Sequence, residues 1–322
     1  MKLAILLLLS LNALLFAKYA NCEFKNPDYT DVCNSVVKKG VTYEYANKFL
    51  MSYFKTRKFD EVSWKYLQPS KIEHHKTQEK KANNALASYI PKMVTHLKEY
   101  EEVYDYVEKT YGVNREIIAA ILLKETKLGK IKPTHDAFIV FNTMVVRAKG
   151  ETPREKWLLK MGKTNMATII EHCYKGGVKP EACNLPSSYA GAVGIPQFMP
   201  NSFVYAKSYE GKMPDLTNMQ DAIVSAANYL NKKAEFNTLI DWDKMEDVPR
   251  IEQEWYEYEF TNKNTSFVYE TNKEGEAYNC FTKDKPELKY MKEYARKIMR
   301  YNNSSNYAVG VISLAYQARY SL

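Results

Sequence analysis

Residues 115–128 read REIIAAILLKETKL, and this stretch has the pattern of a strong amphipathic helix. Its apolar residues recur at three- and four-residue spacing, which places them on one helical face: Ile117, Ile118, Ile121 and Leu122. Asn114 is a good N-cap, Glu116 suits the positive end of the helix dipole, and Gly129 is a stop signal. The sequence therefore predicts a helix over residues 115–128.

Glu125 lies on the apolar face of this predicted helix, four residues after Ile121 and three after Leu122. A carboxyl group held against apolar side chains has a raised pKa, because its ionised form is desolvated. Glycosidic cleavage needs a protonated acid of this kind, since the leaving oxygen must receive a proton. The alternative is an ordinary, partly exposed glutamate, because Lys124 and Lys127 flank it.

Two further segments have side chains suited to binding a glycan. Residues 187–200 read SSYAGAVGIPQFMP, where small residues allow close backbone approach and Gln197 offers both a donor and an acceptor. Residues 300–308 read RYNNSSNYA and open the last predicted helix, with Tyr and Asn side chains that can stack and hydrogen-bond. A tight structural loop and a helix cap are the alternative interpretations of these two segments.

The rest of the chain is mainly helical, with one β-rich segment. Helical periodicity is expected over residues 43–53, 86–111, 166–174, 219–233 and 288–319. A polar segment marked by Pro is expected around residues 148–164, and a loop over residues 185–200. Aromatic and polar residues alternate within residues 251–282, between turn residues, and this predicts a small antiparallel meander.

The N-terminus predicts export. Met1-Lys2 precedes a short apolar run that closes at Ala17, which is typical of a secretory signal peptide and too short for a membrane-spanning helix. We expect cleavage after Ala17 and a periplasmic location. Lipid attachment at Cys22, and with it membrane association, remains an alternative.

Export permits disulfides among the five cysteines. Cys173 and Cys183 enclose a Gly- and Pro-containing loop, and Cys22 and Cys33 could close another, leaving Cys280 alone. Five free thiols are the alternative. The spacing does not resemble a metal site, so we expect no metal.

The composition favours a folded protein with an anionic partner. The chain has 322 residues, of which 45% are hydrophobic and 26% are charged. This composition excludes the disordered and collagen-like classes of protein. The net charge of +8 favours an anionic polymer or surface outside the cytoplasm as partner, such as cell-wall peptide carboxylates or lipid headgroups. An ordinary soluble surface is the alternative interpretation of this charge. No nucleic-acid-binding signature is present.

In this order the three segments resemble the membrane-bound lytic murein transglycosylase B family of peptidoglycan-cleaving enzymes. The first motif comprises residues 111–113, 117–121 and 125–129; the second, residues 188–194, 197–200, 221–223 and 227–229; the third, Tyr301, Asn302, Ser304, Tyr307 and Ala308. The resemblance covers about residues 85–235 and 288–319.

The resemblance implies a mainly α, lysozyme-like catalytic domain with a glycan groove, here with a small antiparallel β insertion. It implies one catalytic glutamate, matched by Glu125, which would protonate the oxygen between N-acetylmuramic acid and N-acetylglucosamine. Glu125 would then take the proton of the muramic C6 hydroxyl as a 1,6-anhydro ring closes, so neither a second carboxylate nor a cofactor is needed. Substrate-binding positions are matched by Ser188, Gln197, Phe198, Tyr301, Asn302 and Tyr307.

The expected organisation is a signal peptide (1–17), an N-terminal helical region (18–110), a lysozyme-like core (111–235), an aromatic-rich β insertion (236–287) and a closing helix (288–322).

Glycan strands are the expected partner, other cell-wall enzymes are candidate partners, and we expect a monomer. A muramidase that hydrolyses the same bond, and an inactive wall-binding protein, are the alternative functions.

Two departures from the family pattern stand out. Residues 208–215 read SYEGKMPD where relatives often carry a calcium loop, and they hold too few carboxylates for calcium. Relatives also tend to carry an arginine pair after the catalytic helix, whereas this chain has only Arg147 and then Arg154.

Overall fold

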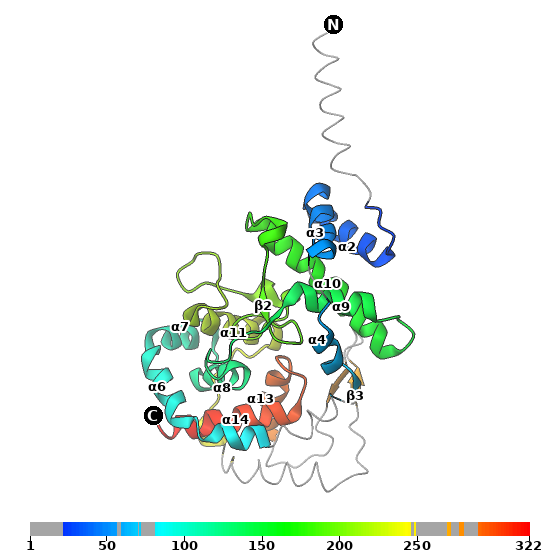
Figure 1. The fold of residues 1–322 in the computed structure, drawn as a ribbon. Helices are drawn as coiled ribbons and strands as arrows, with labels where there is room; N and C mark the ends of the chain where they lie inside the picture. The colour runs from blue at the N-terminus through cyan, green and yellow to red at the C-terminus, as the bar shows by residue number, and fades with distance from the viewer. Residues whose placement is uncertain are drawn as a thin grey trace, which may run out of the picture. The chain divides into compact units, whose positions relative to one another are not determined.

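The computed structural model describes residues 22–56, 59–69, 71, 81–245, 248, 269–271, 277–279 and 289–322 (Figure 1). The named α-helices in this part are α2 (Pro27–Lys38), α3 (Tyr43–Thr56), α4 (Glu61–Tyr66), α6 (Ile90–Glu99), α7 (Glu101–Tyr111), α8 (Arg115–Thr126), α9 (Ala137–Arg147), α10 (Pro153–Lys175), α11 (Met219–Ala234), α13 (Lys289–Met299) and α14 (Ser305–Arg319). Within these residues, no helix has the length and apolar character needed to cross a membrane.

The chain divides into two compact units, each assembled from separated stretches of sequence. Unit 1 comprises residues 1–71, 133–193 and 198–203, and unit 2 comprises residues 72–132, 194–197 and 204–322. The sequential functional regions expected from the sequence remain a prediction.

Unit 1 is built around the long helix α10, which packs on α9 and α2. The first turn of α10 carries a capping box, in which the side chains of Thr152 and Glu155 satisfy each other's backbone N–H groups. The helix expected near residues 166–174 therefore begins much earlier, within the polar segment 148–164: Pro153 is a favourable first helical residue, and α10 begins there. Gly162 lies where α10 packs against α9. A Cβ atom at residue 162 would lie 3.0 Å from the Phe141 carbonyl oxygen, so glycine allows the two helices to approach closely.

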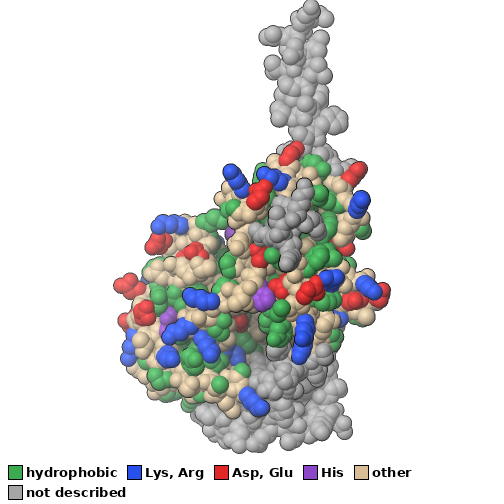
Figure 2. Space-filling view, viewed as in Figure 1, with side chains coloured by type: hydrophobic (Ala, Val, Ile, Leu, Met, Phe, Trp, Pro, Cys, Tyr) green, Lys and Arg blue, Asp and Glu red, His purple; other side chains and the backbone are tan. Residues whose placement is uncertain are grey.

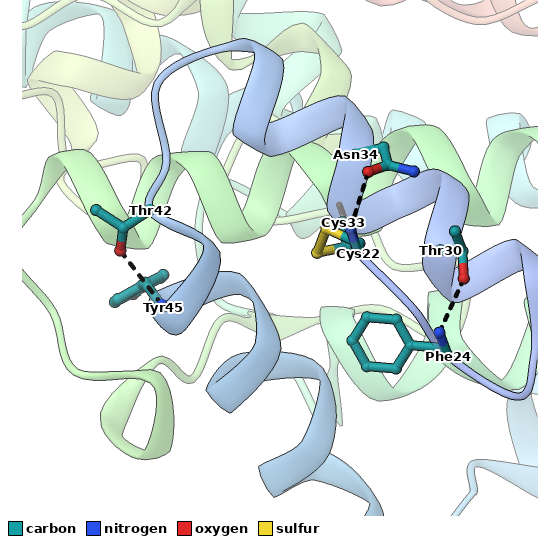
Figure 3. The surroundings of a disulfide bond; sticks show 7 residues. All are labelled: Cys22, Phe24, Thr30, Cys33, Asn34, Thr42 and Tyr45. Carbon is teal, nitrogen blue, oxygen red and sulfur yellow. Dashed lines mark hydrogen bonds between the residues drawn. A yellow bond between two sulfur atoms is a disulfide. The ribbon is translucent and has the colours of Figure 1, made fainter. Parts of the chain in front are cut away.

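Two disulfides cross-link unit 1. One joins Cys22 to Cys33 in α2, with Cα atoms 5.8 Å apart, and the Cys22 backbone N–H donates to Asn34 beside it (Figure 3). The other joins Cys173, near the end of α10, to Cys183, which follows the short 3-10 helix η1 (Pro180–Ala182). Together they attach both the N-terminal segment and the loop after α10 to the core.

Unit 2 surrounds α8, which contacts α6, α7, α11 and α14. Residues 117–123 of α8 are all fully buried, so this helix lacks the exposed face that an amphipathic pattern implies. The reason is that neighbouring helices cover it on several sides. Asn114 precedes α8 but does not cap it through its side chain; its Oδ1 instead accepts a hydrogen bond from the Ile240 backbone N–H at 2.7 Å.

Two of the predicted long helices are interrupted. The stretch 86–111 turns at residues 88–89 and again at Tyr100, between α6 and α7. The stretch 288–319 is interrupted at residues 300–304, where Ser304 caps α14. Periodicity alone does not show such turns, because apolar spacing continues across them.

Short antiparallel pairs complete the fold. Strands β1 (His135–Asp136) and β2 (Pro186–Ser187) pair within unit 1. Strands β3 (Tyr269–Thr271) and β4 (Ala277–Asn279) pair in unit 2, with Glu270 opposite Tyr278. The predicted run at residues 256–260 lies outside the described residues.

Candidate active site

The end of α8 positions Glu125 through a tightly bonded turn. Lys127, Leu128 and Gly129 all adopt left-handed backbone conformations, so the chain reverses directly after Thr126. The buried Thr126 hydroxyl donates to the Ile195 carbonyl at 3.1 Å and accepts from the Gly129 N–H at 3.0 Å. These bonds join the end of α8 to the loop 194–197.

The Glu125 carboxyl is partly buried and accepts a hydrogen bond from Tyr307, whose hydroxyl lies 2.6 Å from Oε1. Tyr307 is only 4% exposed and lies in the first turn of α14. Ser304 caps this turn by accepting the Tyr307 backbone N–H at 3.1 Å. The Asn/Ser-rich segment is thus a helix cap that fixes the partner of Glu125.

Tyr301 is the second tyrosine near Glu125. Its hydroxyl donates to the Pro196 carbonyl, and its ring packs against Tyr229 of α11 with centroids 5.0 Å apart. Burial, followed by the negative charge of Glu125, raises the pKa of Tyr301 well above its usual value. Tyr301 therefore keeps its proton and remains a hydrogen-bond donor.

The loop 194–197 is held rigidly within unit 2. Gly194 has φ +75°, and a Cβ there would lie 2.4 Å from the Leu216 Cβ, so only glycine fits. The Ile195 N–H donates to the Leu216 carbonyl at 2.8 Å. Gln197 has φ +52°, and its Nε2 donates to the Gly194 carbonyl at 2.8 Å. This loop therefore places Gln197 by backbone contacts.

Four of the predicted site residues belong to unit 2, namely Glu125, Gln197, Tyr301 and Tyr307, and the structure brings Glu125, Tyr301 and Tyr307 together. Tyr307 is buried and donates a hydrogen bond to the Glu125 carboxyl group, and its contact with the glycan stays a prediction. Asn302 is exposed in the segment between α13 and α14.

Ser188 and Phe198, also predicted to bind substrate, belong to unit 1. Ser188 is partly exposed and makes a tight turn, in which its Oγ accepts the Ala192 N–H at 3.2 Å. Phe198 is 2% exposed, and its backbone pairs with Val193. Its contact with substrate stays a prediction.

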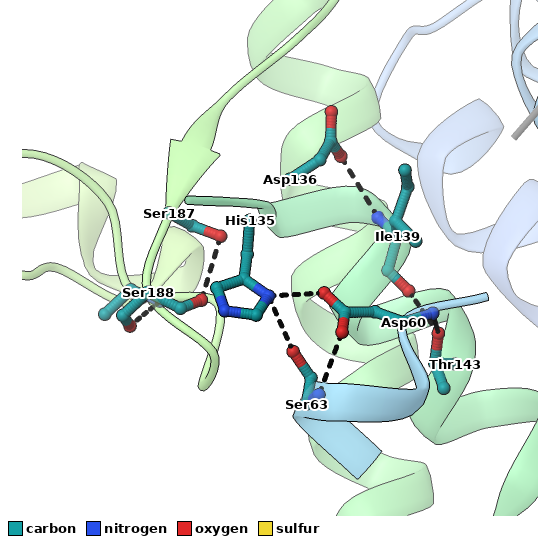
Figure 4. Close-up of polar contacts among 9 residues, drawn as sticks. Asp60, Ser63, His135, Asp136, Ile139, Thr143, Ser187 and Ser188 are labelled. Atoms are coloured by element: carbon teal, nitrogen blue, oxygen red, sulfur yellow. Dashed lines mark hydrogen bonds and ion pairs between the residues drawn. The ribbon is translucent and has the colours of Figure 1, made fainter. Parts of the chain in front are cut away.

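Unit 1 also holds a polar cluster that the sequence analysis missed (Figure 4). His135 Nδ1 lies 2.6 Å from Asp60 Oδ2 and 3.2 Å from the Ser63 hydroxyl. Both partners meet the same ring nitrogen, so the imidazole cannot relay a proton from serine to aspartate. Burial alone would raise the pKa of Asp60, but hydrogen bonds from Ser63 and His135 lower it below its usual value. Asp60 is the N-cap of α4, which indicates a structural role.

The arginines noted in the sequence are engaged within unit 1. Arg147 pairs with Glu61, and the Arg154 guanidinium donates to the Leu67 carbonyl at 3.3 Å and stacks 4.3 Å from the Trp157 ring centroid.

Loop 208–215 is organised by Asp221 at the start of α11. Asp221 Oδ1 and Oδ2 accept the backbone N–H groups of Tyr209 and Asp215, both at 2.8 Å. Lys212 pairs with Glu210 inside the loop. Among the described residues, no group of three His, Cys, Asp or Glu side chains could hold a metal ion.

Comparisons with known proteins identify the family. A family model described as the Transglycosylase SLT domain matches residues 25–316. The structure of the Escherichia coli lytic transglycosylase Slt35 in complex with bulgecin A is similar, with a TM-score of 0.60 and 19% identity over 92% of this chain and 94% of that chain. A comparison with curated protein sequences gives no match.

Two Pseudomonas aeruginosa structures are also similar. Soluble lytic transglycosylase SltB1 has a TM-score of 0.57 and 20% identity over 90% of this chain and 99% of that chain. SltB3 in complex with NAG-anhNAM-pentapeptide has a TM-score of 0.56 and 19% identity over 89% of this chain and 77% of that chain. The predicted helical, lysozyme-like fold is thereby confirmed. With a family model that spans nearly its whole length, this chain belongs to the Transglycosylase SLT domain family and is a lytic murein transglycosylase.

Proposed function

We propose that this enzyme cleaves the β-1,4 bond between N-acetylmuramic acid and N-acetylglucosamine without water, with Glu125 as the single acid and base. The observation that carries the proposal is the hydrogen bond from buried Tyr307 to Glu125, beside the Tyr301 ring. A carboxyl group held in one orientation by a buried donor is suited to transfer a proton at a defined position.

The proposed reaction has two proton transfers. Protonated Glu125 gives its proton to the glycosidic oxygen as the C1–O bond breaks and positive charge develops at the muramic C1. The carboxylate then removes the C6 hydroxyl proton while the C6 oxygen bonds to C1, which closes the 1,6-anhydro ring and returns Glu125 to its protonated form. An intramolecular nucleophile has a high effective concentration, so no general base for water is required. The Tyr307 hydrogen bond stabilises the carboxylate between the two steps.

We further propose that the substrate is a peptidoglycan strand that carries stem peptides. The SltB3 structures hold NAG-anhNAM-pentapeptide and NAG-NAM-pentapeptide, which supports this class of substrate. In unit 2, Gln197 and Asn302 supply amide groups suited to sugar hydroxyls and acetamido groups. Ser188 supplies a hydroxyl group of this kind in unit 1. Basic side chains are spread over the part of unit 2 that contains α6 and α8, where peptide carboxylates would be attracted (Figure 2).

The same proposal places the mature protein in the periplasm after removal of residues 1–17. Two disulfides within unit 1 support an oxidising compartment. The sulfur of Cys22 is bonded to Cys33, which argues against a lipid thioether at that atom.

Replacing Glu125 by Gln tests the assignment, because the amide keeps the shape and cannot supply the proton. We expect E125Q to fold normally and to lose nearly all release of muropeptides from purified peptidoglycan. Glu116→Gln on the same helix is the matched control, since Glu116 is buried and bonds Arg319 rather than Tyr307. Near wild-type turnover by folded E125Q would refute the role of Glu125.

Mass spectrometry of the products separates the three candidate activities. We expect 1,6-anhydro-muramic ends from the wild-type protein. Reducing ends would instead identify a muramidase, and binding without any cleavage would identify a wall-binding protein.

A further inference from the structure

We propose that Lys124 is a positioning residue for this reaction: held by Asn83, its ammonium group lies over the Tyr307 ring and controls the hydrogen bond that Tyr307 donates to Glu125. The inference rests on the proposed role of Glu125. It assigns a function to a lysine that the sequence pattern presented only as a flanking charge.

The contact between Lys124 and Tyr307 is direct. Lys124 precedes Glu125 in α8, and its Nζ lies 4.9 Å from the centroid of the Tyr307 ring. A cation in this position is attracted by the ring, and the attraction grows where water is excluded. Tyr307 is 4% exposed, so this contact is largely desolvated, and the same tyrosine reaches Glu125 Oε1 at 2.6 Å.

Asn83 holds the lysine in place. The Lys124 ammonium donates to Asn83 Oδ1, and Asn83 Nδ2 donates to the Asn306 carbonyl at 3.1 Å. Asn306 directly precedes Tyr307 at the start of α14. The Asn83 amide therefore connects the α8 lysine to the helical turn that carries Tyr307.

Gly310 shows how closely this connection is packed. A Cβ atom at residue 310 would lie 2.4 Å from Asn83 Nδ2, well inside van der Waals contact. Asn83 itself is 4% exposed. The absence of a side chain at position 310 thus makes room for the Asn83 amide against α14.

The electrostatic effect has a defined sign. A positive charge over the phenol makes its hydroxyl a stronger donor, and it also attracts the Glu125 carboxylate directly. Tyr307 from α14 donates to the carboxyl group, Tyr301 from the segment before α14 is close enough for the Glu125 charge to raise its pKa, and Tyr229 from α11 packs against Tyr301. Lys127, on the next turn of the chain, lies over the Tyr89 ring instead.

Lys124 therefore favours the ionised form of Glu125, which the second proton transfer uses. Without this charge, Glu125 should keep its proton to higher pH. Because the first step needs protonated Glu125, the loss of kcat/KM on the alkaline side should then begin at higher pH.

The test compares Lys124→Met, which keeps the side-chain length and removes the charge, with Lys124→Arg, which keeps the charge. Lys92→Met is the matched control, since Lys92 lies 4.7 Å from the Tyr89 ring centroid and not over Tyr307. The measurement is the pH profile of kcat/KM for release of anhydro-muropeptides. A Lys124→Gln variant repeats the test should the methionine variant fold poorly.

We expect the alkaline limb of the K124M pH profile to move upward by about half to one pH unit, the size expected for the loss of one positive charge near a partly buried carboxyl group. K124R and K92M should retain the wild-type limb. An unmoved limb in K124M, or an equal movement in K92M, would overturn the proposal. Activity of folded E125Q would instead refute the proposed function, so the two failures are distinguishable.

Discussion

The disulfide between Cys173 and Cys183 permits a quantitative prediction about stability. We consider the double replacement of both cysteines by Ala. Both sulfur-bearing residues are buried in the core of unit 1, their Cα atoms lie 6.1 Å apart, and their sequence separation is 10. Removing the bond leaves the folded core nearly unchanged, whereas the unfolded chain gains the freedom of an open loop.

The expected loss follows from the loop length. For a closed loop of this separation, the chain-entropy relation gives a loss of about 2.7 kcal/mol in the free energy of unfolding. At roughly 2–4 °C per kcal/mol, the melting temperature should fall by about 5–10 °C. Ala in place of Cys also removes buried sulfur atoms, which adds to the loss.

The matched control is the double Ala replacement of Cys22 and Cys33, whose sequence separation of 11 predicts nearly the same entropic loss. The Cys173–Cys183 loop leads directly into the Ser188–Pro200 segment, so its loss should also raise KM. The control variant should lose stability to a similar extent without a rise in KM. Turnover at saturating substrate should remain, because Glu125 belongs to unit 2.

Scanning calorimetry measures the melting temperature, and a thiol count on denatured, unreduced protein measures pairing. Cys280 is expected to be the only cysteine that reacts. Alkylation of Cys173 and Cys183 in peptide mapping, or an unchanged melting temperature in the double variant, would refute the reasoning.

Two further stability predictions concern charged groups. Burial raises the pKa of Glu116, which is 1% exposed, above the usual 4.5, so its stabilising contribution is present at low pH and is lost as the pH rises through the folded-state pKa. Glu116→Gln should therefore gain stability relative to the wild type as the pH rises from 4.5 to the folded-state pKa, by up to about 1.4 kcal/mol for each pH unit of that interval. A constant difference between acid and neutral pH would contradict this. The carboxylate of Asp221 already accepts two backbone N–H groups in loop 208–215, so millimolar calcium or a chelator should leave the melting temperature unchanged. A rise of several degrees with calcium would show that the loop binds the ion.

Local sequence signals predicted much of the helical content and failed at helix boundaries. The apolar periodicity before Glu125 predicted α8, which ends at Thr126, although the side chain of Asn114 does not cap this helix. Residues 219–233 predicted α11 closely. The start of α10 was missed although Thr152 and Glu155 form a capping box, because the stretch before residue 166 is polar and lacks a clear apolar periodicity. The turn at Tyr100 was missed because apolar spacing runs through it.

The sequence by itself determined that α8 forms, and that Glu125 lies at its end beside a chain reversal, because caps, helical periodicity and glycine conformations act over a few residues. Only the tertiary structure decided which side chains meet that carboxyl group. Tyr307 reaches Glu125 across 182 residues of sequence, and Asn83 reaches Asn306 across 223. Such contacts depend on how whole helices pack and which rotamers the packing permits, and no pattern of neighbouring residues encodes them.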